Sequence, residues 1–524
     1  MSGSEGCGKS QLLAWLVRHG RQSGAPAARA VHAVVPFAGQ SLRGTVWSIA
    51  DQLGVVARAP GELAVALSRD PRRTVIVLPD LHDEDVTGLA LDLVRLPHVR
   101  LIAESRSGSP AHRVLSHAEC AELDLDLAQW RDQRRFEQWR AAQPDDRATA
   151  SPATVETPLD LSDPAAVCEA DPWEVTSAYD RADDQDHGGL RAAWRRAGQS
   201  LCREQPPASR ALVLLSLLGD SADPRVAPAL REVAASADWG IEWSRVRGDL
   251  TPPWPGPVTT LAMGKGPLAD CLVAVGPDGT VKAVRMADAG ARGRLPHNRL
   301  RPVAVDVMTD GTVLMLDEHG RLEAQSGWAA RPAGAGLAGL LDEGPTGAQR
   351  LLDSMEGHTG TALAHAAGGD LGFVALGDAI GTVRIFGDVA DSAQLHEGRV
   401  NALAAISVPL DDVAVPLVYS GGADGTVRAW SPGRAPMTAP VLQQPFPVVS
   451  MDATFTRNGP ATVVAWGDGT VECVHWDMGV QQTFRPGPPV RAVAVDADSR
   501  VLVGMDEALI CLVPKAVTGD GGVA

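Results

Sequence analysis

The first ten residues carry a glycine-rich spacing that suits phosphate chemistry. Residues 3–10 read Gly-Ser-Glu-Gly-Cys-Gly-Lys-Ser, which is the complete pattern G-x-x-x-x-G-K-S. Loops of this pattern hold phosphate groups, and the pattern is specific enough to name a nucleoside triphosphate as the ligand. The residues that we expect to bind it are Gly3, Gly6, Cys7, Gly8, Lys9 and Ser10.

A loop of this kind normally follows a buried β-strand that aims it. Only Met1 and Ser2 precede Gly3, so the sequence as written has no room for that strand. We therefore expect a start site placed too far downstream, or a fragment, and weak ATP binding and poor solubility of the front domain as written. A Mg-ATP dissociation constant in the low micromolar range for residues 1–125 would contradict this expectation.

The pattern of residues 1–125 predicts a parallel α/β sheet. Helical periodicity over 10–19 and 42–53 alternates with strand-like apolar runs. Runs that are apolar throughout are typical of strands covered on both faces. The predicted strands are 30–36, 74–78, 99–103 and, at the far end of the sheet, 121–127.

Residues 126–236 carry few strand signals and are expected to form a helical region. An amphipathic helix is predicted over 126–143 and a polar linker near 144–158. Helical segments separated by Asp-Pro and Gly-Asp breaks then run from 164 to 235. At the other end of the chain, residues 516–524 are expected to be a disordered tail.

A short turn followed by alternating residues recurs over residues 237–515. Its clearest copies are Asp-Gly-Thr-Val at 278–281, 424–427 and 468–471. A four-stranded repeat of ~40–45 residues is the period of a β-propeller blade, and Asp-Gly favours its tight hairpins. We predict an all-β propeller of six blades; a longer interval near 330–356 holds an insertion or a degenerate seventh blade.

The last repeat supplies only three strands. Residues 238–245 (Asp-Trp-Gly-Ile-Glu-Trp-Ser-Arg) have the pattern of a strand and precede the first blade. They are expected to complete the last blade and close the ring, because closure removes exposed sheet edges.

Composition bounds the environment and the partners. The 524 residues allow two or three domains, and the formal net charge of -17 argues against a nucleic-acid or anionic-membrane surface. The seven cysteines are scattered without a C-x-x-C pair, so neither a zinc site nor a disulfide framework is indicated. No apolar run approaches the ~20 residues of a membrane helix. A cytoplasmic protein is the simplest interpretation.

Residues 1–125 resemble the signal-transduction nucleoside triphosphatases with numerous domains, relatives of the AAA+ proteins. Residues 3–10 match the family's Walker A loop in full. The resemblance implies ATP and Mg²⁺ as cofactors, with Lys9 neutralising the β- and γ-phosphates and Ser10 binding Mg²⁺. Cys7 lies inside the loop, and we expect its oxidation to block nucleotide binding.

The Walker B strand of this family corresponds to the apolar run 75–78. The resemblance makes Asp80 the second Mg²⁺ ligand if Pro79 counts as part of the strand, whereas a gap-free match puts Pro79 itself at that position. The acid that polarises water is therefore Asp83, Glu84 or neither. An acidic turn after a buried strand is the alternative.

The next strand ends in Glu-Ser-Arg at 104–106, where the family often has Thr-Ser-Arg. The resemblance makes Arg106 a sensor of the γ-phosphate, and a solvated arginine at a strand end is the alternative. Glu104 replaces the usual threonine.

The repeats, over about half of the chain, resemble WD repeats. The family's structural network joins a His before the first strand, a Ser or Thr on the second, an Asp in the turn and a Trp on the third. In the best-matching blade these positions are His396, Ser420, Asp424 and Trp430. The resemblance implies that they hold blades in place and do no chemistry.

These features predict a nucleotide-gated signalling protein. The front domain would bind ATP, the helical region would relay its state, and the propeller would bind a protein partner; slow Mg-dependent hydrolysis would reset the switch. The first alternative is a non-enzymatic scaffold beside a vestigial nucleotide-binding domain. The second is an ATP-powered remodeller, which would need an arginine finger and a ring of subunits. The partner, hydrolysis and oligomerisation are left open.

Overall fold

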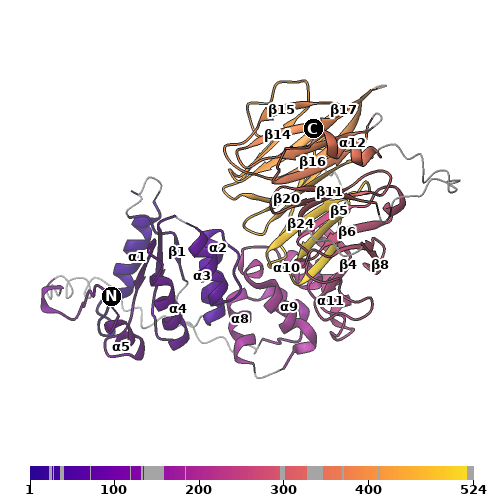
Figure 1. The fold of residues 1–524 in the computed structure, drawn as a ribbon. Helices are drawn as coiled ribbons and strands as arrows, with labels where there is room; N and C mark the ends of the chain where they lie inside the picture. The colour runs from indigo at the N-terminus through magenta and orange to yellow at the C-terminus, as the bar shows by residue number, and fades with distance from the viewer. Residues whose placement is uncertain are drawn as a thin grey trace, which may run out of the picture. The chain divides into compact units, whose positions relative to one another are not determined.

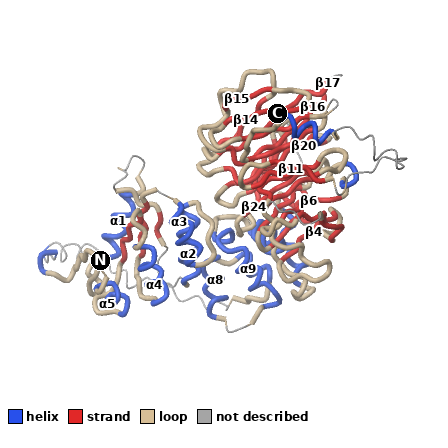
Figure 2. Tube along the Cα trace, viewed as in Figure 1, coloured by secondary structure: helices blue, strands red, loops and turns tan. Residues whose placement is uncertain are grey.

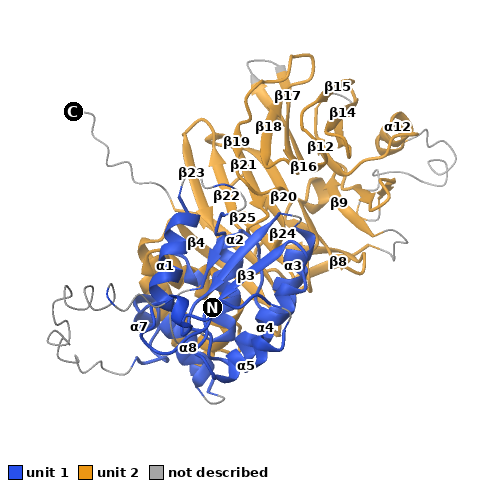
Figure 3. Ribbon diagram, turned by 90° about the vertical axis from the view of Figure 1, so that its left-hand side faces the viewer, with its two compact units in different colours: residues 1–187, 201–204 blue, residues 188–200, 205–524 orange. Residues whose placement is uncertain are grey.

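The chain divides into two compact units (Figure 3). The first holds Met1–His187 with Leu201–Glu204, and the second holds Gly188–Ser200 with Gln205–Ala524. The linker expected near 144–158 and the tail expected at 516–524 lie outside the described residues. This computed structural model describes residues 1–515 apart from 23–25, 27–28, 36–40, 71, 119, 131–133, 135–158, 183–184, 296–300, 327, 329–345, 369–370 and 411–412.

The first unit contains a parallel sheet of three strands in the order β1 (Ala33–Val34), β2 (Thr74–Leu78) and β3 (Val99–Ala103) (Figure 1). All five residues of β2 are buried, which explains its unbroken apolar sequence. β2 and β3 coincide with predicted strands, whereas the strand predicted over 30–36 is only two residues long.

Helices flank this sheet, and their ends follow from local sequence. α2 begins after Ser41, whose hydroxyl accepts a hydrogen bond from the N–H of Gly44, and ends at Gly54, which has φ 67°. The helices predicted over 10–19 and 42–53 are both present. The helices here are α1 (Lys9–Gly20), α2 (Leu42–Leu53), α3 (Pro60–Arg69), α4 (Glu84–Val94) and α5 (Pro110–Ser116).

The start of the chain lies beside β3. The N–H of Ser2 donates to the carbonyl of Leu123, and the N–H of Leu125 donates to the carbonyl of Ser2, both at 3.0 Å. On the β3 side, the N–H of Ser105 donates to the carbonyl of Met1 at 3.0 Å. The residues before Gly3 thus have backbone partners on both sides.

The strand predicted over residues 121–127 was wrong in extent. The structure has only an isolated parallel bridge between Ser2 and Asp124 at this place. A single bridge of this kind is not a ladder of hydrogen bonds, so these residues do not form a strand.

The helical region expected over 126–236 falls into both units. Its earlier helices belong to the first unit and its later helices to the second. Most of the helix expected over 126–143 lies outside the described residues, apart from a 3₁₀ turn at Ala128–Trp130. The helices are α7 (Pro164–Glu169) and α8 (Pro172–Arg181), then α9 (Leu190–Ala197), α10 (Pro207–Ser216) and α11 (Val226–Val233). No helix in the described part of the chain is long and apolar enough to cross a membrane.

The second unit is a six-bladed β-propeller (Figure 2). Each blade is an antiparallel sheet. Successive strands are neighbours in the first five blades, as the repeats predicted, whereas the last blade takes its outer strand from the segment that precedes the first blade. The second blade has three strands among the described residues, where the repeat predicted four. The first blade is β5 (Thr260–Met263), β6 (Cys271–Val275), β7 (Val281–Arg285) and β8 (Ala291–Arg294), and the second is β9 (Pro302–Val307), β10 (Val313–Asp317) and β11 (Leu322–Gln325). The third is β12 (Ala362–Ala366), β13 (Phe373–Gly377), β14 (Thr382–Gly387) and β15 (Asp391–Gln394), and the fourth is β16 (Val400–Leu410), β17 (Val413–Gly422), β18 (Thr426–Trp430) and β19 (Leu442–Gln443). The fifth is β20 (Val448–Thr456), β21 (Gly459–Trp466), β22 (Val471–His475) and β23 (Val480–Phe484), and the last is β24 (Val490–Val495), β25 (Val501–Met505), β26 (Ala508–Pro514) and β4 (Trp239–Val246).

The ring closes as predicted from residues 238–245. β4, which precedes the first blade in sequence, pairs antiparallel with β26 of the last blade, from Val246 opposite Ala508 to Trp239 opposite Pro514. Apolar side chains fill the spaces between neighbouring blades, and one such cluster includes Trp243 of β4. Closure therefore gives β26 a partner on both sides, and β4 becomes the outer strand of the last blade.

The long interval between the second and third blades holds a helix. α12 (Gly347–Ser354) begins after Thr346, whose hydroxyl accepts a hydrogen bond from the N–H of Gln349. Residues 329–345 of this interval lie outside the described residues. Since the described sheets form six blades, the prediction of six blades is confirmed, and no seventh blade appears among the described residues.

Candidate functional site

The glycine-rich loop leads directly into α1. Gly6 and Gly8 have φ values of 78° and 94°, in the left-handed region that favours glycine. Gly8 is the N-cap of α1, and no side chain caps this helix end. The first N–H groups of a helix have no partner within the helix, and its dipole favours an anion there. This end of α1 can therefore receive a phosphate group.

The ammonium group of Lys9 is turned back over the loop. Its Nζ donates to the carbonyls of Gly3 and Ser4 at 2.9 and 2.8 Å, and lies 3.7 Å from Sγ of Cys7. These carbonyls are weak partners compared with an anion. Phosphate oxygens at the same place would compete for the Lys9 ammonium.

Ser10 contacts a residue to which sequence analysis gave no role. Its hydroxyl donates to Oε1 of Glu104 at 2.8 Å. Glu104 directly follows β3, and the N–H of Leu81 donates to its carbonyl at 2.7 Å. The side chain is buried, and its Oε2 has no hydrogen-bond partner among the described residues. The replacement of the usual threonine by an acid was the available signal.

Asp126 holds the loop and was also missed. Its carboxylate accepts hydrogen bonds from the N–H of Ser4 at 2.8 Å and from the Ser4 hydroxyl at 2.7 Å. The Ser107 hydroxyl donates to the same carboxylate at 3.2 Å, and the Ser107 N–H donates to the carbonyl of Gly3 at 3.1 Å. The loop conformation thus depends on the segments that follow β3 and the Ser2–Asp124 bridge.

Arg106 lies at the loop as predicted, but its guanidinium is already paired. It forms an ion pair with the carboxylate of Glu5, which is itself a loop residue. Both side chains are largely exposed, so the pair stabilises the fold little and can exchange for another anion. The sensor role of Arg106 stays a prediction.

The three acids after β2 take different positions. Asp80 is exposed with φ 46°, and Nδ1 of His82 donates to its carbonyl at 2.7 Å. Asp83 caps α4 by accepting from the N–H groups of Asp85 and Val86 at 2.8 and 3.0 Å. Glu84 is the first residue of α4 and is exposed.

The structure does not join these acids to the loop. Asp83 already uses one carboxylate oxygen as a helix cap, which accounts for it without any chemistry. In the part of the chain that the structure describes, no three His, Cys, Asp or Glu side chains group as a metal site. The Mg²⁺ role of Asp80 and the catalytic roles of Asp83 and Glu84 stay predictions.

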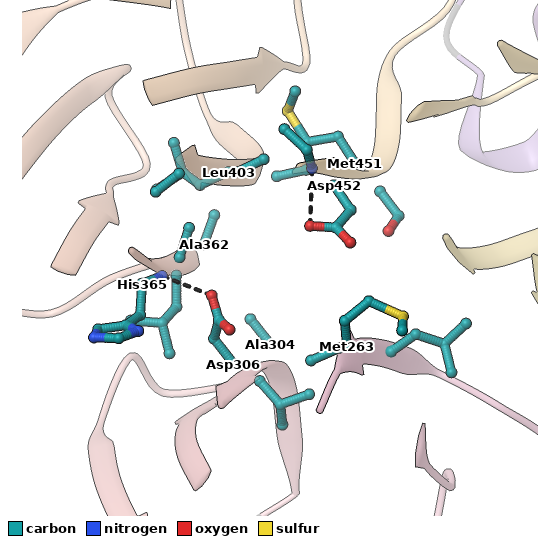
Figure 4. Close-up of a pocket in the computed structure, with 18 of the residues that line it drawn as sticks. Met263, Ala304, Asp306, Ala362, His365, Leu403, Met451 and Asp452 are labelled. Carbon is teal, nitrogen blue, oxygen red and sulfur yellow. Dashed lines mark hydrogen bonds between the residues drawn. The ribbon is translucent and has the colours of Figure 1, made fainter. Parts of the chain in front are cut away.

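The innermost strands of the propeller surround a cavity of about 390 Å³ (Figure 4). Asp306 accepts hydrogen bonds from Nζ of Lys265 at 2.9 Å and from the N–H of His365 at 2.6 Å. Asp452 accepts from the N–H of Val495 at 2.9 Å. Burial beside this cavity disfavours the charged form and raises the pKa of the Asp452 carboxyl group to about 7. Asp306 connects its own blade to the blades on both sides, and Asp452 connects its blade to the next one, which is a structural role.

Three of the four WD-like residues meet in the fourth blade. Nε2 of His396 lies 2.8 Å from the Ser420 hydroxyl, and Nδ1 lies 3.1 Å from Oδ1 of Asp424. Burial lowers the pKa of His396. Trp430 stands outside this network, because its Nε1 donates to the carbonyl of Arg434 at 2.9 Å. The inclusion of Trp430 was therefore wrong.

Comparison with known proteins adds little to this geometry. No family model matches the chain, and no curated protein matches it. The solved structures that it resembles include the computationally designed Ika8 protein, with 20% sequence identity over 48% of this chain and 70% of that one. The TM-score of that match is 0.29, which is too low to carry an argument about either fold or function.

Proposed function

We propose that this chain binds a nucleoside triphosphate, ATP, at residues 3–10 and that the bound nucleotide regulates a protein partner of the propeller. The observation that carries the proposal is the position of Lys9. Its ammonium lies over the carbonyls of Gly3 and Ser4, next to the uncapped N-terminus of α1. A cation and free N–H groups at one helix end are the elements that recognise phosphate.

The residues present fit a metal-bound nucleotide. Lys9 would neutralise phosphate charge, Ser10 would supply a hydroxyl oxygen to Mg²⁺, and the loop N–H groups would orient the phosphates. Mg²⁺ would neutralise charge on the phosphate oxygens during transfer. The unpartnered Oε2 of Glu104, beside Ser10, is a further oxygen of the kind that a hard cation takes.

The propeller supports a binding role over a catalytic one. Its half-buried carboxylates Asp306 and Asp452 bond to backbone N–H groups, and the network of His396 is structural as well. Propellers host many unrelated ligands, so the partner's identity does not follow from the fold. Slow Mg-dependent hydrolysis remains part of the proposal. The scaffold with a vestigial nucleotide-binding domain is the alternative.

The test is nucleotide binding by the full chain. We expect a fluorescent, non-hydrolysable ATP analogue to bind, and Lys9→Ala to weaken binding by at least about tenfold, since it removes a charge that contacts phosphate. Arg18→Ala is the matched control, because Arg18 is an exposed cation on the same helix. Equal affinity of Lys9→Ala and the unaltered protein would refute the proposal.

The two alternatives differ in turnover and coupling. A nucleotide-gated protein hydrolyses ATP slowly in Mg²⁺ and loses this activity in Lys9→Ala, whereas a scaffold shows no turnover in either form. Hydrogen exchange of the propeller with and without the analogue then measures whether bound nucleotide changes the local stability of the propeller.

A further inference from the structure

Glu104 is a buried carboxylate at the loop that pairs with neither Lys9 nor Arg106, although the ammonium group of Met1 acts on it electrostatically. Its side chain is 4% exposed, and within the part of the chain that the structure describes, one of its two oxygens has a hydrogen-bond partner and the other has none. Lys9 contacts the carbonyls of the loop instead, and Arg106 pairs with Glu5. A buried carboxylate is costly unless a cation or donors meet its oxygens. The stability of this arrangement therefore increases when a cation binds beside Ser10.

We propose that Glu104 and Ser10 together hold the Mg²⁺ ion of the bound nucleotide, so that the protein carboxylate comes from the end of β3 and not from Asp80. This inference rests on the proposed nucleotide binding at residues 3–10. The Ser10 hydroxyl, 2.8 Å from Oε1 of Glu104, places both donors at the first turn of α1. Mg²⁺ takes carboxylate and hydroxyl oxygens together with phosphate oxygens and water.

The position of Asp80 supports this assignment. Asp80 is exposed, and the described residues include no hydrogen bond or ion pair that joins it to the loop. Glu104, in contrast, is fixed by the adjoining strand, because its N–H donates to the carbonyl of Leu78 at 2.9 Å. The better-placed carboxylate is thus Glu104.

In this arrangement Glu104 lowers nucleotide affinity without Mg²⁺ and raises it with Mg²⁺. Without Mg²⁺, a carboxylate at the first turn of α1 repels the phosphates and opposes nucleotide binding. With Mg²⁺, the same carboxylate binds the ion that the phosphates share. Glu104 would therefore select the metal-bound nucleotide over the free one, and a purely structural role predicts no such reversal.

The experiment is titration of the full chain with a fluorescent, non-hydrolysable ATP analogue, in EDTA and in Mg²⁺. For Glu104→Gln we expect roughly tenfold tighter binding in EDTA, because a repelling charge is lost. We expect no further increase in affinity when Mg²⁺ is added; this increase is called the Mg²⁺ gain. For Asp80→Asn we expect the Mg²⁺ gain to persist. Glu62→Gln is the control, since Glu62 lies in the first turn of α3 and pairs with Arg58.

A second variant covers the case in which Glu104→Gln does not fold. Ser10→Ala removes the neighbouring hydroxyl and should also lose the Mg²⁺ gain while it keeps the affinity measured in EDTA. Electron paramagnetic resonance of Mn²⁺ then measures the metal held in the ternary complex, and it should fall in both variants. This readout is independent of turnover.

Two results would overturn the assignment while nucleotide binding stands. One is a Glu104→Gln variant whose Mg²⁺ gain equals that of the unaltered protein. The other is loss of the Mg²⁺ gain in Asp80→Asn alone. If the unaltered chain binds the analogue in neither condition, or Lys9→Ala binds it equally well, the proposed function itself fails and this inference fails with it.

Discussion

Nε1 of Trp243 donates a hydrogen bond of 2.6 Å to the carbonyl of Met286. Trp243 lies on β4, which completes the last blade, and Met286 directly follows β7 of the first blade. The indole of Trp243 also packs in the apolar cluster between these two blades. One side chain therefore joins the two ends of the ring by a polar and an apolar contact.

We expect Trp243→Ala to destabilise the propeller by about 3–5 kcal/mol, because it removes a buried aromatic side chain. Trp243→Phe keeps an aromatic side chain but loses the hydrogen bond to Met286, and loss of that bond alone should cost about 1 kcal/mol. Urea unfolding followed by circular dichroism measures both. The exposed Met437→Ala should change stability by less than about 0.5 kcal/mol. Similar curves for Trp243→Ala and Met437→Ala would contradict this account of ring closure.

Loss of His396 should destabilise the propeller far more than loss of the corresponding histidine in the preceding repeat. His396→Ala leaves the buried Ser420 hydroxyl without this partner, and we expect a loss of about 2–4 kcal/mol. His358 occupies the corresponding position in the preceding repeat but is exposed, so His358→Ala should cost less than about 1 kcal/mol. Unfolding experiments on the two variants make the comparison, and equal losses would argue against a structural network in the fourth blade.

His365 should make stability depend on pH. Burial, with a smaller effect of Lys265, lowers the pKa of His365 to about 4, although Asp306 opposes this. Its Nδ1 has no hydrogen-bond partner in the residues that the structure describes. An unfolded histidine has a pKa of about 6.5, so between these values the unfolded chain binds a proton that the folded chain does not. Stability is therefore lost as the pH falls from about 6.5 to about 4.

The measurement is urea unfolding at pH values from 7 to 4. The unaltered protein should lose about 3 kcal/mol more than His365→Gln over this range, because the variant lacks the titrating ring. The difference between the two proteins cancels the contributions of other groups. Parallel losses in both proteins would show that His365 is not the responsible group.

Modification of Cys7 should block the nucleotide site. Its Sγ lies 3.7 Å from Nζ of Lys9, so an alkyl group on this sulfur would enter the space over the loop. We expect ATP affinity to fall by at least about tenfold, since overpacking of a fitted site is costly. The Cys7→Ser protein, treated with the same reagent, controls for the exposed Cys120 and the half-buried Cys202. Unchanged affinity after complete modification of Cys7 rejects the expectation.

The propeller could be predicted from sequence because each blade repeats the same local information. Asp-Gly turns mark hairpins, and alternation fixes which residues face the core. Gly279 and Gly469 have φ values of 82° and 85°, as such turns require. Even the closing strand could be found, because an incomplete last repeat demands a partner.

The candidate site was predictable only in part, because its other residues come from distant segments. Gly3–Ser10 is a continuous motif, whereas Glu104 and Asp126 reach it only through the order of the sheet and the Ser2–Asp124 bridge. The sequence around Asp83 fits both a catalytic acid and a helix cap, because either can follow a strand; the structure shows the cap. Trp430 is on the expected strand, but its hydrogen-bond partner depends on side-chain geometry that the repeat pattern does not contain.

The pairing of β4 with β26 has a consequence for synthesis of the chain. β4 is made before any other strand of the propeller, and its partner is made last. A growing chain therefore carries β4 unpaired while five blades form, and truncation before Ala508 leaves both β4 and β25 with open edges. Such edges template aggregation, so incomplete chains should be recognised and removed as misfolded. Closure of the ring thus depends on the strand of the propeller that is made last.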